Sequence, residues 1–309
     1  MGATASPEPD RAWLESAERL PIDSIWQGGH VMPPINSGEA IVRTSLVAAW
    51  TERVRIGTSI LLLPLYQPAL VAKQLADIDS FSGGRLTVGI GVGGEYPTEF
   101  DAVGVALDER GPRTDEAMEV MRALWAGGPT SYDGRFSRFE GVELRPVTPH
   151  GASAPAMTPG GPPIVVSGRK APAMRRAARH GQGWMPYLVT PNAYARSVDA
   201  IRAEAEVIGR DLEGFEWMLY LYCSIRADGD RAREEAAAGV GRTYANLPAE
   251  VVARIVPAGT PDEVAAGVQA FVDAGARHVI VVPTAKVDTL EVVRLAAEEV
   301  LPQLTVSSS

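Results

Sequence analysis

Apolar positions recur along the chain with two alternating periods, one typical of strands and one of helices. Residues 55–63 form a nearly uncharged run rich in Ile and Leu that Pro64 ends, which favours a strand buried on both faces. From Pro68 to Gly83, apolar residues recur every three or four positions, as in an amphipathic helix. Residues 86–90 form a second buried run. This stretch therefore predicts a βαβ unit with parallel strands and a right-handed crossover.

The same alternation extends over most of the chain. We predict further helices over residues 11–20, 39–51, 113–125, 172–179, 192–208, 261–274 and 289–301, and one that begins at Arg231. We predict further strands over residues 22–26, 164–166, 183–185, 215–225 and 278–282. Because strands alternate with helices of barrel-repeat length, the pattern favours an α/β fold, a TIM-like (β/α)8 barrel, over an open sheet.

Three regions depart from this alternation. A barrel normally opens with a strand, but the first patterned segment is a helix, so the first strand is predicted to be missing from the chain. A start recorded too far downstream would explain this, or the N-terminal residues or a subunit partner would cover the gap. Residues 127–163 are rich in Gly and Pro and predict an insertion over the barrel mouth. We expect one domain over residues 11–302, between disordered segments at 1–10 and 303–309.

The amino-acid composition indicates which classes of binding partner to expect. The chain has 29 basic and 38 acidic residues, a net charge of -9, and no Lys/Arg-rich block, which argues against a nucleic-acid partner. Cys223 is its one cysteine, so an intrachain disulfide and a metal site built from several thiolates are excluded. The sequence has neither a signal-peptide pattern nor an apolar run of the roughly 18 residues that would span a bilayer. We therefore expect a cytoplasmic protein with no metal and no membrane partner.

A glycine motif in the opening unit invites a different interpretation. Gly89, Gly91 and Gly94 satisfy the spacing G-x-G-x-x-G after a predicted strand, as in dinucleotide-binding folds. That fingerprint must open a helix and be followed by an acidic residue at the end of a second strand. Here Pro97 interrupts the segment and a helix is predicted in the region that follows. We therefore predict against a dinucleotide-binding fold.

Several segments together resemble a known family. They are GTSILLLPLYQPALVAKQLADIDSFSGGRLTVGIGVGG, EFDAVGV, ERGPR, PIVVSGRKAPAMRRAARHGQGWMPYLVTP and GTPDEVAAGVQAFVDAGARHVIVVP. The chain resembles the bacterial-luciferase-like flavin and deazaflavin oxidoreductases, specifically the coenzyme F-420 branch, from residue 22 to residue 301. The resemblance implies a TIM-like barrel with an insertion that binds its tricyclic cofactor at the C-terminal ends of the strands. It also implies a non-prolyl cis peptide bond at Ser59–Ile60.

Two groups of residues are the main candidates for chemistry. Ser167, Gly168 and Arg169 precede a predicted helix whose free N–H groups and dipole suit an anion, so they are candidates for binding the cofactor phosphate. An ordinary strand-to-helix turn is the alternative. His30 follows a predicted strand, where it is the candidate catalytic proton donor or acceptor. A loop histidine with its hydrogen bonds satisfied is the alternative.

The other cofactor-binding candidates would surround the flat ring: Ser59, Ile60, Gly91, Gly93, Gly94, Glu95 and Trp184. The serine and the isoleucine would contact one face of the ring, and the glycines would leave room along its edge. A tight turn is the alternative for the glycines, and core filling is the alternative for the tryptophan.

Two positions depart from the family pattern. Many members have an acidic residue immediately before the histidine that corresponds to His30, but this chain has Gly29. Members usually have Asp before the Gly-Trp pair, but this chain has Gln182. The first departure leaves the handling of protons open.

Three functions are consistent with these features. The first is hydride transfer between coenzyme F-420 and a small organic substrate. The second is an FMN-dependent monooxygenase that uses oxygen and has a separate flavin reductase as partner. The third is a non-catalytic flavin-binding homologue. The sequence suggests an apolar, partly aromatic pocket but leaves open the substrate and the choice between a monomer and a homodimer.

Overall fold

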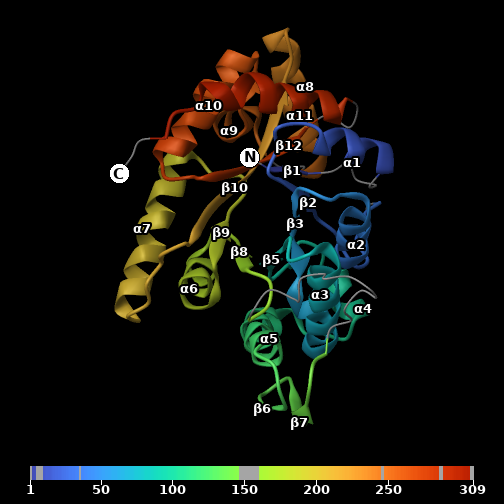
Figure 1. Cartoon of the computed structure of the whole chain (residues 1–309). Helices are drawn as coiled ribbons and strands as arrows, with labels where there is room; N and C mark the ends of the chain where they lie inside the picture. Colours follow the sequence, from blue (N-terminus) through green and yellow to red (C-terminus); the bar gives the residue numbers. More distant parts are fainter. Residues whose placement is uncertain are drawn as a thin grey trace. The chain divides into compact units, whose positions relative to one another are not determined.

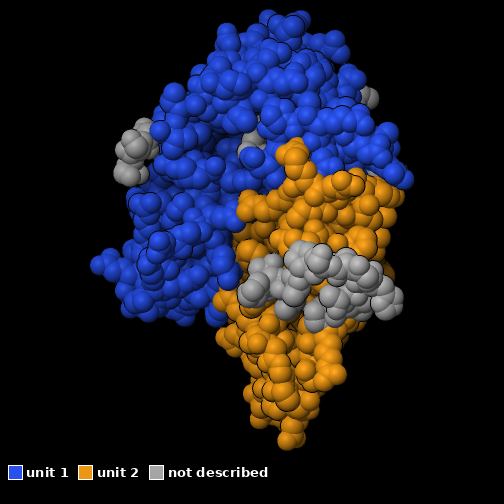
Figure 2. All heavy atoms as spheres, in the orientation of Figure 1, with its two compact units in different colours: residues 1–26, 167–309 blue, residues 27–166 orange. Residues whose placement is uncertain are grey.

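The computed structural model describes residues 2–4, 10–34, 36–145, 160–244, 247–284 and 288–306. Contacts between residues divide the chain into two compact units, coloured separately in Figure 2. Unit 1 comprises residues 1–26 and 167–309, and unit 2 comprises residues 27–166. Both units combine parallel strands with helices (Figure 1).

Unit 2 is built around one fully buried strand, β5 (Leu86–Gly91). It pairs in parallel with β3 (Arg55–Thr58), β4 (Leu61–Leu62) and β8 (Ile164–Ser167, whose last residue lies in unit 1). The helical elements are α2 (Ala40–Trp50), η1 (Leu63–Leu65), α3 (Pro68–Ser82), α4 (Pro97–Ala102), η2 (Leu107–Glu109) and α5 (Arg110–Trp125). β6 (Thr130–Asp133) and β7 (Arg138–Val142) form an antiparallel hairpin.

Helix α3 forms where the hydrophobic period predicts it. Pro68 occupies its first turn, where a missing N–H costs nothing, and Val71 and Leu75 are buried on one side. Gly83 ends the helix at φ 76°, a left-handed conformation that glycine adopts without steric cost. The predicted strand over residues 55–63 is instead divided into β3, β4 and η1, with a turn of the chain at residues 59 and 60.

Arg85 makes hydrogen bonds to several elements of unit 2. Its guanidinium donates to the carbonyl oxygens of Ser82, Val54, Ala48 and Thr51 at 2.7–3.2 Å, and to the Thr51 hydroxyl at 3.0 Å. Two of these carbonyls lie at the C-terminal end of α2, where a helix leaves its last acceptors without partners in the helix. One side chain therefore links the end of α2, the start of β3 and the end of α3.

Replacing Arg85 by Met is expected to lower the free energy of unfolding by about 3 kcal/mol, because several carbonyl acceptors would lose their charged donor. Denaturant unfolding followed by circular dichroism measures the change. Arg11→Met is the matched control, because its ion pair with Glu15 is exposed to solvent and contributes little. Equal stability of the two variants would contradict the assigned role of Arg85.

Unit 1 contains a parallel sheet in the order β9–β10–β12–β1–β2, with β11 beside β10. The strands are β1 (Gly2–Thr4), β2 (Ser24–Gln27, whose last residue lies in unit 2), β9 (Gly183–Met185), β10 (Glu216–Ile225), β11 (Ala258–Gly259) and β12 (His278–Pro283). The helices are α1 (Arg11–Glu18), α6 (Ala171–His180), α7 (Pro191–Val207), α8 (Gly229–Thr243), α9 (Ala249–Ile255), α10 (Pro261–Asp273) and α11 (Thr289–Leu295). A π-helical turn, η3 (Ala296–Val300), and η4 (Leu301–Gln303) follow α11.

The structure corrects the prediction of a missing first strand. Residues 2–4 form β1, which pairs in parallel with β2 on one side and β12 on the other. The prediction was wrong because three residues, Gly-Ala-Thr, are too few and too small to show a hydrophobic period. The expected disorder of residues 1–10 therefore does not hold for residues 2–4. Residues 5–9 lie outside the described part of the chain.

The structure changes two other expectations in part, one for the insertion over residues 127–163 and one for the C-terminal tail. The predicted insertion over residues 127–163 contains the β6–β7 hairpin, whereas residues 146–159 lie outside the described part of the chain. The expectation of a disordered tail is wrong for residues 303–306, because the Thr305 N–H donates to Gln269 Oε1 at 2.9 Å and the Thr305 carbonyl accepts from the Gln269 amide. Residues 307–309 are not described.

Candidate functional site

His30 lies in the loop of unit 2 that leads to α2. Its backbone N–H donates to the Gly38 carbonyl at 3.1 Å, which closes the loop on itself. Its ring Nδ1 lies 3.0 Å from Glu99 Oε2, and the Tyr96 ring meets it edge-on with centroids 5.1 Å apart. The His30 side chain is 24% exposed, so one side of the ring is accessible. The histidine is therefore oriented by its surroundings and still open to a reactant.

Glu99 supplies a carboxylate that the sequence did not assign to the site. It lies on α4, its side chain is 1% exposed, and it also accepts the N–H groups of Val31 and Met32 at 2.8 and 3.2 Å. A buried carboxylate that accepts three hydrogen bonds is held firmly in place. An ionised carboxylate only accepts, so with Glu99 ionised the His30 proton would lie on Nδ1 and leave Nε2 as the acceptor.

The structure shows why glycine precedes His30 and which residue places a carboxylate beside the histidine instead. A Cβ at Gly29 would collide with the Gly38 carbonyl and the backbone of Ala40, so an acidic side chain does not fit before His30 in this loop. Glu99 provides the carboxylate from a helix 69 residues further along the chain. The available signal was its place at the start of the segment EFDAVGV, but no local pattern links it to the histidine.

A second carboxylate fixes the far end of the His30 loop. Glu39 caps α2 by accepting the N–H groups of Ile41 and Val42, and it also accepts the Tyr66 hydroxyl proton. Burial, followed by the hydrogen bond to Glu39, raises the pKa of Tyr66 far above its ordinary value of 10. The phenol therefore stays protonated at any physiological pH and remains a hydrogen-bond donor to Glu39.

The Ser59–Ile60 peptide bond is cis, as the resemblance implies. The Ser59 N–H donates to the Gln27 carbonyl at 2.7 Å, and the Ile60 side chain lies over Gly91, where an added Cβ would collide with it. The Ser59 hydroxyl is buried and has no hydrogen-bond partner among the described residues. An orphaned buried hydroxyl is a feature that a bound polar group would satisfy.

The loop after β5 has the conformation of a tight turn. Gly93 and Gly94 take positive φ values of 65° and 110°, which favour glycine. Gly93 approaches the Phe100 ring, and Gly94 approaches the Arg110 side chain. Glu95 is exposed to solvent. The turn interpretation therefore accounts for both glycines, and their contact with a cofactor stays a prediction.

The predicted phosphate loop lies in unit 1. Gly168 has φ 136°, and a Cβ there would come within 2.6 Å of the Ala173 Cβ, so the chain passes close to the first turn of α6. That helix has no side-chain cap at its N-terminus. The Arg169 guanidinium donates to the Leu188 carbonyl at 3.1 Å and lies 4.7 Å from the Tyr187 ring centroid. Ser167 is 9% exposed.

The structure favours the core-filling alternative for Trp184. Its side chain is fully buried, and its indole N–H donates to the Gly168 carbonyl at 2.9 Å. Its ring packs 5.1 Å from the Tyr194 ring. Core filling accounts for the buried indole, and its contact with a cofactor stays a prediction. Trp184 instead fixes the position of the loop that precedes α6.

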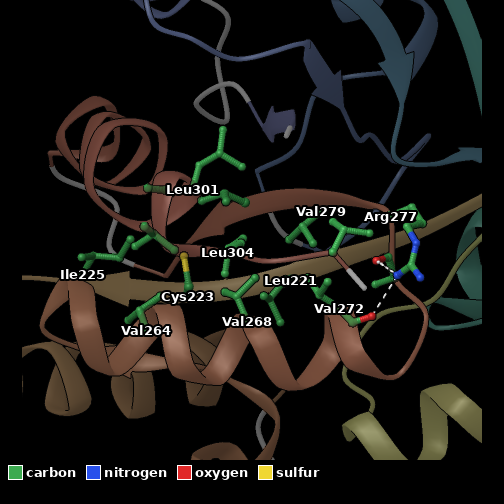
Figure 3. A pocket seen from close by; sticks show the side chains of 15 residues that line it. Leu221, Cys223, Ile225, Val264, Val268, Val272, Arg277, Val279, Leu301 and Leu304 are labelled. Atoms are coloured by element: carbon green, nitrogen blue, oxygen red, sulfur yellow. Dashed lines mark hydrogen bonds between the residues drawn. The ribbon is translucent and has the colours of Figure 1, made fainter. Parts of the chain in front are cut away.

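An apolar cavity of about 140 Å³ lies in unit 1 (Figure 3). Side chains from β10, β12, α10 and the C-terminal segment line it, and Arg277 at one end donates to the Val272 and Ala276 carbonyls. Burial raises the pKa of the Cys223 thiol, which also lines the cavity, to about 12. A thiol that remains protonated in apolar surroundings is not a nucleophile. The cavity therefore lies outside the candidate catalytic machinery.

Comparison with known proteins decides the family. A family model described as luciferase-like monooxygenase matches residues 2–247. The chain belongs to the luciferase-like monooxygenase family. Among the relatives of this luciferase-like protein is the F-420-dependent glucose-6-phosphate dehydrogenase of Tsukamurella paurometabola. It is 29% identical over 299 residues, which cover 86% of this chain and 84% of that protein.

Solved structures confirm the predicted α/β barrel fold. The monooxygenase RslO1 from Streptomyces bottropensis superposes with a TM-score of 0.80 at 25% identity, over 97% of this chain and 98% of that one. An F-420-dependent secondary alcohol dehydrogenase in complex with an F-420–acetone adduct superposes with a TM-score of 0.84 at 22% identity, over 98% of both chains. The resemblance seen in the sequence motifs is thus confirmed over nearly the whole luciferase-like chain.

Two further features of this luciferase-like protein concern membranes and metals. No helix in the described ranges is both long enough and apolar enough to cross a membrane. Within the same ranges, no group of three or more His, Cys, Asp or Glu side chains is arranged to hold a metal ion.

Proposed function

We propose that this luciferase-like protein is an oxidoreductase that transfers hydride between coenzyme F-420 and a small organic substrate. The observation that carries the proposal is the His30 ring held at 3.0 Å by the buried Glu99 carboxylate. Interconversion of an alcohol and a carbonyl compound moves one hydride and one proton, and a positioned imidazole is suited to the proton. The names of two relatives, both F-420-dependent dehydrogenases, support the choice of cofactor.

Each unit, taken by itself, has a feature that suits a bound polar group. In unit 1, the backbone N–H groups of Ser167, Gly168 and Arg169 and the uncapped start of α6 suit a phosphate. In unit 2, the orphaned Ser59 hydroxyl suits a polar atom of the ring system, and Ile60 offers an apolar surface beside it. When bound, the deazaflavin supplies the chemistry of hydride acceptance and donation.

His30 would accept and return the proton of the reaction. With its proton on Nδ1 bound to Glu99, Nε2 accepts a proton from an alcohol and returns it in the reverse direction. Glu99 stabilises the imidazolium that forms, and it prevents the ring from rotating. Its three hydrogen bonds are made within the protein, so this orientation does not depend on a ligand.

Parallel titration of the purified protein with coenzyme F-420 and FMN tests the cofactor. We expect F-420 to bind with a dissociation constant at least tenfold lower than that of FMN. We also expect the deazaflavin absorbance to change when a substrate is added. Tighter binding of FMN would contradict the proposal. Tight F-420 binding with no turnover over a wide substrate panel would favour the non-catalytic homologue.

An FMN-dependent monooxygenase is the second candidate, which the likeness to RslO1 favours. Under this alternative, a separate flavin reductase would supply reduced FMN, and a flavin peroxide would be detected after reduced FMN and oxygen are mixed with the protein. Cytoplasmic location stays a prediction under both functions, and the choice between a monomer and a homodimer stays open.

A further inference from the structure

The apolar cavity of unit 1 lies between two strands of the sheet and α10, which packs beside them (Figure 3). From β10, every second residue between Leu221 and Ile225 lines the cavity, as expected of side chains on one face of a strand. From α10, three valines spaced four residues apart line it: Val264, Val268 and Val272. The sheet and the helix thus meet here through side chains that leave a space between them.

The small size of the lining side chains explains the cavity. Of the fifteen described residues that line it, seven are Val, two are Ala and none is aromatic. Protein interiors are normally packed to the density of organic crystals, with few voids larger than a water molecule. The volume here is about 140 Å³, whereas a single water molecule needs about 10–15 Å³. The cavity therefore has room for a molecule of several heavy atoms.

The lining offers little to a polar or charged ligand. Apart from Arg277 and Cys223, the described lining residues are aliphatic. The Arg277 guanidinium lies at one end and donates to the Val272 and Ala276 carbonyls, each at 2.9 Å. The Cys223 thiol is uncharged, because burial raises its pKa to about 12. Cavities of about 150 Å³ that are lined by Leu, Ile and Phe stay dry and bind benzene or xenon.

One wall of the cavity is a π-helical turn. The chain forms η3 directly after α11, and Ala296 and Val300 of this turn line the cavity. Turns of this kind are rare in proteins, and they occur frequently at functional sites. The turn is a second observation, independent of the volume, that points to a ligand at this wall.

The C-terminal segment, residues 301–306, closes the cavity on another side. Leu301 and Leu304 of this segment line it. Gln269 of α10 fixes the segment through two exposed hydrogen bonds with the backbone of Thr305, each at 2.9 Å. A segment held by few, exposed hydrogen bonds opens locally at low cost. The C-terminal segment is therefore a suitable entrance to the cavity.

We infer that the cavity is a binding site for one small, uncharged, apolar molecule of about the size of benzene, which enters when the C-terminal segment opens. The lining residues all belong to unit 1, and none of them is among the residues proposed to take part in hydride transfer. This binding site therefore goes beyond the proposed function and does not depend on it. Removal of the ligand's apolar surface from water drives the binding.

Titration of the full chain with benzene, followed by NMR of methyl-labelled Leu and Val side chains, tests this site. We expect saturable binding of one molecule, with the largest shift changes at lining residues such as Leu221 and Val268. Isothermal titration of the same protein gives the dissociation constant. Shift changes without saturation, or changes that are largest outside the lining residues, would overturn the site.

Two variants fill the cavity from different elements. Val268→Phe on α10 and Ala296→Leu on η3 each place a larger side chain in it, so each should weaken benzene binding by about tenfold or more. Val207→Phe is the matched control, because that side chain is 83% exposed, and it should bind benzene as the wild type does. Circular dichroism verifies the fold, and the second filling variant decides if the first does not fold. Unchanged benzene affinity in a folded filling variant would overturn the site.

Gln269→Ala tests the entrance. The change removes both hydrogen bonds to Thr305, so it should speed the exchange of benzene measured by NMR about fivefold. An unchanged exchange rate would contradict entry beneath the C-terminal segment.

Titration with F-420 distinguishes the failure of this site from the failure of the proposed function. We expect the two filling variants to lose benzene binding and to keep the F-420 affinity of the wild type. A protein that binds F-420 but not benzene would overturn the apolar site alone. A protein that binds benzene in the cavity but does not bind F-420 would support the apolar site and contradict the proposed cofactor.

Discussion

Glu99→Gln is expected to lower kcat by about a hundredfold, within the range of 10²–10⁴ that general acid–base groups contribute. Glutamine has nearly the same shape, so its carbonyl oxygen can still accept the Val31 and Met32 N–H groups. Its amide group would then face His30 and donate to Nδ1, which moves the ring proton to Nε2. The imidazole would be in place but in the wrong tautomer. Steady-state turnover of F-420, followed by its absorbance, measures the loss.

A double-variant comparison shows whether Glu99 acts through His30. His30→Asn should cost about as much as Glu99→Gln, and the two changes together should cost little more than either one. Asp101→Asn is the control, since Asp101 is an exposed carboxylate on the same helix, α4. Full additivity of the two losses, or normal turnover by Glu99→Gln with intact F-420 binding, would contradict the positioning role.

Gly168→Val is expected to weaken F-420 binding by about a hundredfold, or about 2.8 kcal/mol. Gly168 has φ 136°, and even a Cβ alone would come within 2.6 Å of Ala173. A branched side chain must therefore displace the loop from the start of α6, whose N–H groups are proposed to bind the phosphate. The Trp184 hydrogen bond to the Gly168 carbonyl would be strained by the same movement. Fluorescence titration with F-420 measures the change in affinity.

Gly209→Ala is the control that distinguishes displacement of the binding loop from the general strain of a side chain at positive φ. Gly209 also has a positive φ, 65°, but nothing lies within 4 Å of the added Cβ. This control should lose about 1 kcal/mol of stability and keep its affinity for F-420. Equal F-420 affinity for Gly168→Val and the wild type, with the variant folded, would exclude residues 167–169 from the phosphate site.

Much of the fold could be predicted because its signals are local. The period of Val71 and Leu75 and the cap at Gly83 defined α3, and the buried run at residues 183–185 coincides with β9. Helix α4 escaped prediction because it spans six residues and Pro97 was taken as an interruption instead of a first-turn residue. Strand β1 also escaped prediction, because its three residues form a strand only through their pairing with β2 and β12.

The candidate site was predictable in its parts but not in its contacts. The sequence by itself determined the alternation of strands and helices, and through family resemblance it pointed to His30 and the Ser59–Ile60 bond. Only the tertiary structure brought Glu99 to His30 and buried Trp184. Periodicity and caps are properties of a few adjacent residues. Contacts between segments that are tens of residues apart depend on how the whole chain packs, and no local pattern records them.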